Sequence, residues 1–240
     1  MAKGRKKKKT SFGDLFIKTI KELLQWLFII MTIAILASYL YYHFKYKVDT
    51  TDKSNISLNR VPAVVTKTEK NYGKKVDELA KKFDLPANYL KALICLECSG
   101  RTKFSPRFEK RIYTSLKEVR EGVYDHFGSI SRATIKDASD DALKNLASSW
   151  GQFQLMGYQC IALGINVKDI RGDKSLYWGV YWINKRYGNY LRKKKYKDAF
   201  HIHNTGQPMP HFGKPYTYDP NYIPKGMKYM SYFELLEKNK

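Results

Sequence analysis

The chain has 240 residues, 15% aromatic side chains and a formal net charge of +22. The aromatic content argues against a disordered chain, and three cysteines are too few, and odd in number, for a disulfide scaffold. The positive charge favours an anionic partner, for which nucleic acid, acidic lipid head groups and a carboxylate-rich cell-wall polymer are the candidates.

Residues 23–42 form an uncharged apolar stretch, LLQWLFIIMTIAILASYLYY, which is long enough to cross a bilayer as a helix. Trp26 lies near one end and Tyr39, Tyr41 and Tyr42 lie near the other, where interfacial aromatic residues are common. No small-residue cleavage pattern follows, so we expect an uncleaved, single-pass anchor in contact with membrane lipid.

The flanking charges predict how this helix is oriented. Residues 1–22 are rich in lysine and arginine, including the run KGRKKKK, whereas the lysines after the helix are diluted by Asp49 and Asp52. Because positive charge stays inside, we expect a cytoplasmic tail, an anchor in the cell inner membrane and a periplasmic or extracellular domain. A nucleic-acid-binding arm is the other interpretation of the basic run.

The remaining chain is predicted to be mainly α, with a polar linker over residues 43–70 and one globular domain over residues 71–240. Expected helices cover residues 76–83, a segment that begins near Pro86, and residues 111–127, 140–147, 152–163, 176–192, 198–203 and 231–238. A short hairpin fits residues 128–135. Residues 206–230 are rich in Gly, Pro and Tyr and are expected to form an ordered surface loop.

The metal-ligand candidates are few. The cysteines are Cys95, Cys98 and Cys160, and the first two form a CxxC pair on an apolar helix without a second pair, so buried thiols are favoured over a zinc site. Three histidines lie close together in the sequence, at His201, His203 and His211. Rings in a His-x-His pattern point apart on a helix and no acidic residue is adjacent, so no metal or other cofactor is predicted.

The segment LPANYLKALICLECSG, residues 85–100, places a carboxylate among apolar residues. On a helix, Glu97 shares one face with Leu90, Leu93 and Ile94. Because burial disfavours the charged form of a carboxyl group, we expect a raised pKa for Glu97, which suits a general acid near neutral pH. The alternative is a structural ion pair at the rim, with Arg101 or Lys103.

Two further segments, SSWGQFQLMG at residues 148–157 and AFHIHNTGQP at residues 199–208, complete an ordered set of motifs. The three segments resemble the lysozyme-like lytic transglycosylases and goose-type lysozymes, whose pattern is an apolar helix ending in Glu-Ser, then Gly-Leu-Met-Gln, then Tyr-Asn-Ala-Gly. The corresponding residues are Glu97-Cys98, Gly151-Gln152-Phe153-Gln154 and His203-Asn204-Thr205-Gly206. SPRFEKRIY, residues 105–113, also resembles an Arg-x-Glu segment of phage-type members.

This resemblance implies a lysozyme-like fold, α+β with minimal β, and cleavage of the MurNAc-β-1,4-GlcNAc bond in peptidoglycan glycan strands. Glu97 would protonate the leaving oxygen and then, ionised, accept the proton of the muramyl 6-hydroxyl, which closes a 1,6-anhydro ring. The residues expected at the substrate are Ser99, Glu109, Gln152, Gln154, Tyr158, His203 and Asn204. Cys98 and His203 replace the serine and tyrosine of the family pattern. Either replacement is expected to alter the rate or the pH optimum of cleavage.

A hydrolytic member of the fold would use a second carboxylate to orient water. The candidates are Glu109, which is the best placed, and Asp125, Asp137, Asp140 and Asp141. We favour a structural role for Glu109, paired with Arg107 or Arg111 at the wall of the cleft. Three aromatic residues would either stack on sugars or pack in the core, namely Trp150, Tyr158 and Tyr187.

The leading prediction is therefore a membrane-anchored peptidoglycan lytic transglycosylase. The alternatives are a hydrolytic muramidase of the same fold and a non-catalytic glycan-binding scaffold within an envelope-spanning complex. A nucleic-acid binder ranks last, because the expected topology places the basic domain outside the cytoplasm, and nucleic acid is not a predicted partner.

Overall fold

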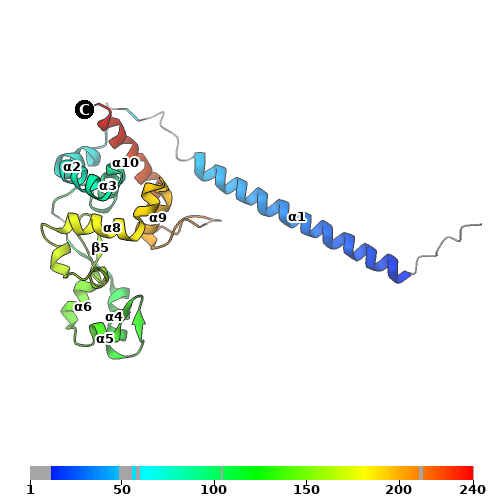
Figure 1. Ribbon diagram of the computed structural model, residues 1–240, viewed down its shortest axis with the longest axis horizontal. Coiled ribbons are helices and arrows are strands. Elements are labelled where there is room, and N and C mark those ends of the chain that lie inside the picture. Colours follow the sequence, from blue (N-terminus) through cyan, green and yellow to red (C-terminus); the bar gives the residue numbers. More distant parts are fainter. Residues whose placement is uncertain (1–11, 49–55, 58–59, 104, 211–212, 240) are drawn as a thin grey trace, which may run out of the picture. The chain divides into compact units, whose positions relative to one another are not determined.

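The computed structural model describes residues 12–48, 56–57, 60–103, 105–210 and 213–239 (Figure 1). This part of the chain is mainly helical, as predicted, with a few very short strands. The chain divides into two compact units, one around the N-terminal helix and one formed by residues 52–209 and 215–240.

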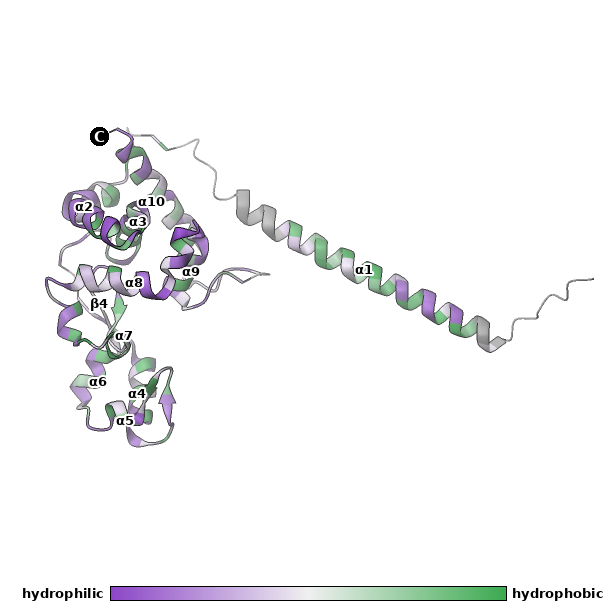
Figure 2. Cartoon of the chain, in the orientation of Figure 1, coloured by the Kyte–Doolittle hydropathy of each residue, from purple (hydrophilic) through white to green (hydrophobic). Residues whose placement is uncertain are grey.

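The N-terminal helix α1, Phe12–Val48, contains a stretch that is long and apolar enough to cross a membrane, Phe16–Tyr41. Large apolar side chains along it are exposed, and Figure 2 shows the hydrophobic colour concentrated in the middle of the helix. Thr32 Oγ1 donates to the Phe28 carbonyl at 2.8 Å, so this hydroxyl is satisfied within the helix. Residues 1–11 of the predicted cytoplasmic tail lie outside the described residues.

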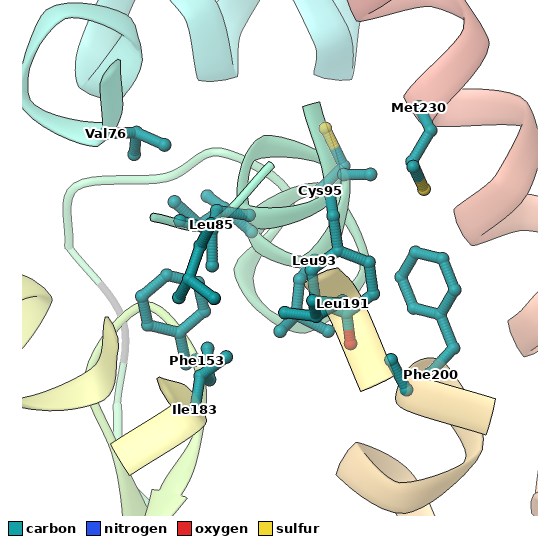
Figure 3. Close-up of a cluster of buried hydrophobic side chains, with 14 of the residues drawn as sticks. Val76, Leu85, Leu93, Cys95, Phe153, Ile183, Leu191, Phe200 and Met230 are labelled. Carbon is teal, nitrogen blue, oxygen red and sulfur yellow. The ribbon is translucent and has the colours of Figure 1, made fainter. Parts of the chain in front are cut away.

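The central helix of the globular unit is α3, Ala87–Cys98, and the residues from Tyr89 to Cys95 are all buried. Two helices pack directly on it, α2 (Ala63–Phe83) and α10 (Tyr222–Glu237). Two more, α8 (Ser175–Arg192) and α9 (Tyr196–Thr205), pack on each other and on the first two. Figure 3 shows Leu93 and Cys95 of α3 among side chains from the surrounding helices.

A smaller cluster of elements encloses a second core. It contains α4 (Lys110–Glu121), β2 (His126–Phe127), β3 (Ile130–Ser131), α5 (Arg132–Ile135) and α6 (Asp140–Leu146). A three-stranded antiparallel sheet of order β1-β4-β5 borders these elements in sequence. Its strands are Arg107–Phe108, which precedes α4, and Ser148–Trp150 and Leu155–Met156, which come after α6. The chain then continues through α7, Gln159–Leu163, and a 3-10 helix, Val167–Ile170. This sheet carries the second motif toward the end of α3.

The second helix corrects one expectation from the sequence. It begins at Ala63 rather than near residue 76, so residues 63–70 are helical and not linker. Its buried face includes Thr68 and Tyr72 beside Val65 and Val76, and these two polar members conceal the helical period in the sequence. Residues 43–48 of the predicted linker belong to α1, and residues 49–55 and 58–59 lie outside the described residues.

Two further expectations are wrong. Residues 152–158 form a turn and β5 rather than helix, because Gly151 and Gln154 adopt the left-handed φ values of 73° and 49°. Residues 222–230 form the first half of α10 rather than loop. The helix at residues 111–127 ends at Glu121, where Gly122 caps it with a φ of 83°. The hairpin covers residues 126–131 rather than 128–135, and residues 132–135 form α5 instead of strand, whereas the other helices agree within a few residues.

Candidate active site

Glu97 lies in the last turn of α3, and 16% of its side chain is exposed. Leu90, Leu93 and Ile94 of the predicted shared face are fully buried. Loss of hydration in this position raises the pKa of Glu97 to about 7, in the direction that the sequence predicted. A substantial fraction of Glu97 therefore keeps its proton at neutral pH.

Tyr222, the first residue of α10, donates a hydrogen bond from its hydroxyl to Glu97 Oε1. This bond favours the ionised carboxylate, as does the positive charge of Arg107, so both moderate the rise in the pKa that burial causes. Burial and the neighbouring Glu97 together raise the pKa of Tyr222 well above 10, which keeps this phenol a hydrogen-bond donor. The predicted alternative partner Arg101 instead donates from Nε to the Cys98 carbonyl at 3.2 Å.

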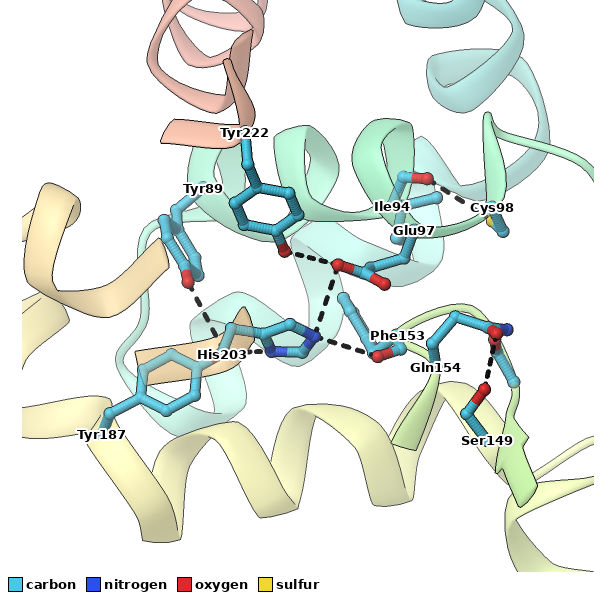
Figure 4. A network of polar contacts seen from close by, with 11 residues as sticks. Tyr89, Ile94, Glu97, Cys98, Ser149, Phe153, Gln154, Tyr187, His203 and Tyr222 are labelled. Atoms are coloured by element: carbon cyan, nitrogen blue, oxygen red, sulfur yellow. Dashed lines mark hydrogen bonds and ion pairs between the residues drawn. The ribbon is translucent and has the colours of Figure 1, made fainter. Parts of the chain in front are cut away.

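His203 completes the surroundings of the acid, as Figure 4 shows. Its Nε2 lies 3.0 Å from the Phe153 carbonyl and 3.8 Å from Glu97 Oε1, while its Nδ1 lies 2.7 Å from the Tyr187 hydroxyl. A carbonyl only accepts, so Nε2 carries the hydrogen and Nδ1 accepts from Tyr187. Burial lowers the pKa of His203 to about 4, so the ring is neutral at pH 7 and forms no ion pair with Glu97.

Tyr89 of α3 extends this chain of polar contacts into the core. Its hydroxyl donates to the Tyr187 hydroxyl at 3.4 Å, and Tyr187 in turn donates to His203. Both tyrosines are almost completely buried, so their positions are fixed by packing. The His203 ring is thereby held in one orientation, with its Nε2–H toward Phe153 and Glu97.

Gln154 is the glutamine of the second motif, and it is held rigidly in the turn between β4 and β5. Its Oε1 accepts from Ser149 Oγ at 2.8 Å and its Nε2 donates to the Gly151 carbonyl at 3.0 Å. Ser149 pairs with Arg107 across the sheet. Figure 4 shows Gln154 in the segment after Phe153, on the same side of the site as Glu97. The sheet thus fixes an amide close to the acid.

A pocket of about 260 Å³ opens beside His203. Four of the predicted substrate-binding residues line it, namely Gln154, Tyr158, His203 and Asn204. Asn204 is exposed, and Tyr158 is half-buried with its ring edge against Phe127 at a centroid distance of 5.6 Å. The structure therefore brings the second and third motifs together around one polar pocket. Glu97 itself does not line this pocket, but its Oε1 lies 3.8 Å from Nε2 of His203, which does.

Three other predicted substrate-binding residues do not line this pocket. Gln152 accepts from Ser175 Oγ at 3.0 Å and so connects its turn to α8. Glu109 forms the expected ion pair with Arg107, with 2.9 Å between Oε1 and Nε. Ser99 is exposed and ends α3 with a left-handed φ of 54°. For these residues the structure gives contacts that stabilise the surrounding fold.

The remaining aromatic and histidine candidates have structural contacts. Tyr187 is only 1% exposed, and Trp150 lies under the Arg171 guanidinium at 4.6 Å from the ring centroid. Buried His201 donates from Nδ1 to the Gln207 carbonyl and accepts from the Tyr216 N–H at 3.0 Å, so it holds the loop after α9. His211 lies outside the described residues.

Within the described part of the chain no group of three His, Cys, Asp or Glu side chains could hold a metal ion. The three cysteines are free and buried, as expected from the sequence. Burial raises the pKa of the Cys98 thiol to about 11, so Cys98 is a neutral neighbour of Glu97 and not an anion.

Two residues of the site escaped the sequence analysis, Tyr222 and Trp182. Tyr222 lies in a Gly-, Pro- and Tyr-rich segment that was predicted to be loop, and Trp182 lies on a long helix where its position alone does not distinguish a site residue from a core residue. Comparison of the chain with protein-family models, curated proteins and solved structures finds no match. The chemistry of the site therefore rests on its geometry and on the three motifs.

Proposed function

We propose that the protein is a membrane-anchored peptidoglycan lytic transglycosylase that uses Glu97 first as an acid and then as a base. One arrangement carries the proposal: the buried carboxyl group of Glu97, whose pKa burial raises to about 7, has its Oε1 3.8 Å from Nε2 of His203, which lines a polar pocket together with other residues of the second and third motifs. General acids of glycoside cleavage need a proton at working pH, and burial is how a carboxyl group keeps it.

The contacts of Glu97 assign different roles to its two oxygens. Oε1 accepts from Tyr222 and faces the Nε2–H of His203. We therefore place the proton of the neutral acid on Oε2, from which it would pass to the departing glycosidic oxygen. As that bond breaks, positive charge develops at C1 of the muramyl sugar, and the substrate's own acetamido group stabilises it.

In the second step the ionised Glu97 accepts the proton of the muramyl 6-hydroxyl. At the same time the oxygen of that hydroxyl bonds to C1, which closes the 1,6-anhydro ring. The hydrogen bond from Tyr222 stabilises the carboxylate during this interval, and the Nε2–H of His203, which is bonded to the Phe153 carbonyl, lies 3.8 Å from it. The proton lost in the first step is thus recovered and no water is consumed. His203 occupies the tyrosine position of the family pattern, and Tyr222 supplies a phenol from α10 instead.

The amides of Gln154 and Asn204 lie at the pocket, where each would hydrogen-bond the sugar. Among the candidates for a second catalytic carboxylate, Glu109 is engaged by Arg107, Asp140 by Arg120 and Asp141 by Lys144. This favours the transglycosylase over a hydrolytic muramidase. The stretch Phe16–Tyr41 would anchor the enzyme in the membrane, with its N-terminus cytoplasmic, and the net charge of +22 suits the carboxylates of the wall.

Digestion of purified peptidoglycan by the full-length chain in detergent tests the proposal, with products identified by mass spectrometry. Wild type should release 1,6-anhydro products, one water lighter than those of a muramidase, and Glu97→Gln should lose at least about 1,000-fold in rate. Glu78→Gln, which changes an exposed glutamate on α2, is the matched control. Hydrated products would identify a muramidase, and an active Glu97→Gln would exclude this mechanism.

A further inference from the structure

A second pocket of about 440 Å³ borders the first. The two share three lining residues, Gln159, Trp182 and Arg186. The additional lining of the second pocket comes from Ser129, Ala162, Leu163, Tyr181 and Lys185. A ligand that fills the first pocket and continues past the shared residues would enter the second.

Trp182 forms a fixed wall between the two pockets. Its Nε1 donates to Gln159 Oε1 at 3.3 Å, which ties α8 to α7. Its ring meets the edges of Tyr187 and His203 at centroid distances of 5.9 Å and 5.7 Å. Because this indole contacts Tyr187 and His203 and also lines the second pocket, a group bound in that pocket would have a defined position relative to Glu97.

The second pocket is positively charged. Lys185 and Arg186 are both exposed, and neither has an ion-pair partner among the described residues. No Asp or Glu is among the described residues that line either pocket. Lys185 Nζ lies 5.7 Å from the Tyr181 ring centroid, and Arg186 uses one Nη2–H on the Gly206 carbonyl at 3.3 Å, which leaves other donors available.

We propose that the second pocket binds a carboxylate of the acidic peptide carried by the muramyl sugar next to the first pocket. This inference rests on the proposed function, because it takes the glycan strand to be the ligand of the first pocket. Lys185 and Arg186 hold the carboxylate, and the apolar surface of Ala162, Leu163 and Tyr181 accommodates small aliphatic side chains of the peptide. The enzyme would accordingly prefer strands whose peptides are still attached and charged.

Binding to the full-length wild-type chain tests this with a soluble probe, the disaccharide GlcNAc-MurNAc bearing its tetrapeptide. The probe lacks the MurNAc-GlcNAc bond, so it is not consumed. The comparison probe is the same molecule with its peptide carboxylates converted to amides. We expect the acidic probe to bind about tenfold more tightly than the amidated probe, as for a carboxylate held by two cations.

Substitutions assign the preference to the second pocket. Lys185→Ala should reduce the tenfold preference to about twofold, and Lys185→Glu should abolish or reverse it, whereas Lys75→Ala, an exposed lysine of α2, should leave it intact. Equal binding of both probes to wild type would overturn the inference even if the enzyme cleaves peptidoglycan. If wild type prefers the acidic probe but does not cleave peptidoglycan, the inference about the second pocket is supported and the catalytic proposal is excluded.

Discussion

Glu97 experiences two opposing influences at the scale of single residues. Burial disfavours its charge, while Tyr222 and Arg107 favour it, and the balance leaves the pKa near 7. The first influence could be predicted from sequence because it follows from helical spacing within α3. The second could not, because Tyr222 lies 125 residues away and reaches the acid only through packing of α10 on α3.

Glu97→Gln should stabilise the protein at neutral and alkaline pH. The folded pKa of Glu97 is raised from 4.5 to about 7, so its favourable contribution is complete below pH 4.5 and is lost as the pH rises to about 7. Glutamine has no such loss. The free energy of unfolding of Glu97→Gln, measured relative to that of wild type, should therefore increase by about 3 kcal/mol between pH 4.5 and pH 8.

Chemical unfolding of the full chain in detergent at a series of pH values measures this difference. His203, whose pKa is lowered to about 4, contributes stability above pH 6.5 that is lost as the pH falls toward 4. Both proteins retain His203, so subtracting their curves isolates Glu97. A pH-independent difference would show that Glu97 is ionised and solvated in the folded protein.

Tyr222→Phe removes a donor to the carboxylate and leaves the ring. The pKa of Glu97 should rise further, which moves the alkaline limb of the pH–rate profile to higher pH. In the proposed mechanism the ionised base of the second step loses a charge-assisted hydrogen bond, so the maximal rate should fall by about 10- to 100-fold. Tyr229→Phe, a half-buried tyrosine on the same helix, is the control. An unshifted profile would contradict the role given to Tyr222.

The helix α10 positions this phenol. Gly226 lies one turn after Tyr222, and a Cβ at Gly226 would come within 2.7 Å of the Phe200 ring, which is fully buried and cannot move away. Glycine therefore allows α10 to approach α9 closely. In the sequence the same glycine, with Pro224 before it, indicated a loop, so the feature that permits close packing also concealed the helix.

Gly226→Ala should force α10 away from α9. Overpacking of this kind destabilises proteins by about 1 to 3 kcal/mol, and here it should also lower activity by displacing Tyr222 from Glu97. Lys228→Ala on the exposed face of α10 provides the control, and urea unfolding together with the rate measures both effects. A variant with wild-type activity would show that the α10–α9 contact is dispensable for the site.

Other elements also differ in how far their structure could be predicted from the local sequence. The helices α6, α8 and α9 were predicted because their apolar periods are strong and local. Residues 152–158 were misassigned, because the left-handed conformation of Gln154 is maintained by its bonds to Ser149 and Gly151, which a helical pattern does not reveal. The site is therefore least predictable where its polar groups are held by turns.

At the scale of the whole molecule, α1 should hold the protein in the membrane. Its stretch Phe16–Tyr41 has exposed apolar side chains, so the full chain should remain with membranes after alkaline and high-salt washes. Deletion of residues 12–48 should move the protein to the soluble fraction. Release of the full chain by salt alone would show instead that its net charge of +22 accounts for the association.

The bond between Tyr222 and Glu97 has a consequence for biosynthesis. A ribosome makes Glu97 long before it makes Tyr222, which lies 125 residues later in the chain. In the proposed enzyme, a nascent or prematurely terminated polypeptide would carry a carboxyl group without its donor. The capacity to cut the wall would then be acquired only once α10 has been synthesised and has docked on α3.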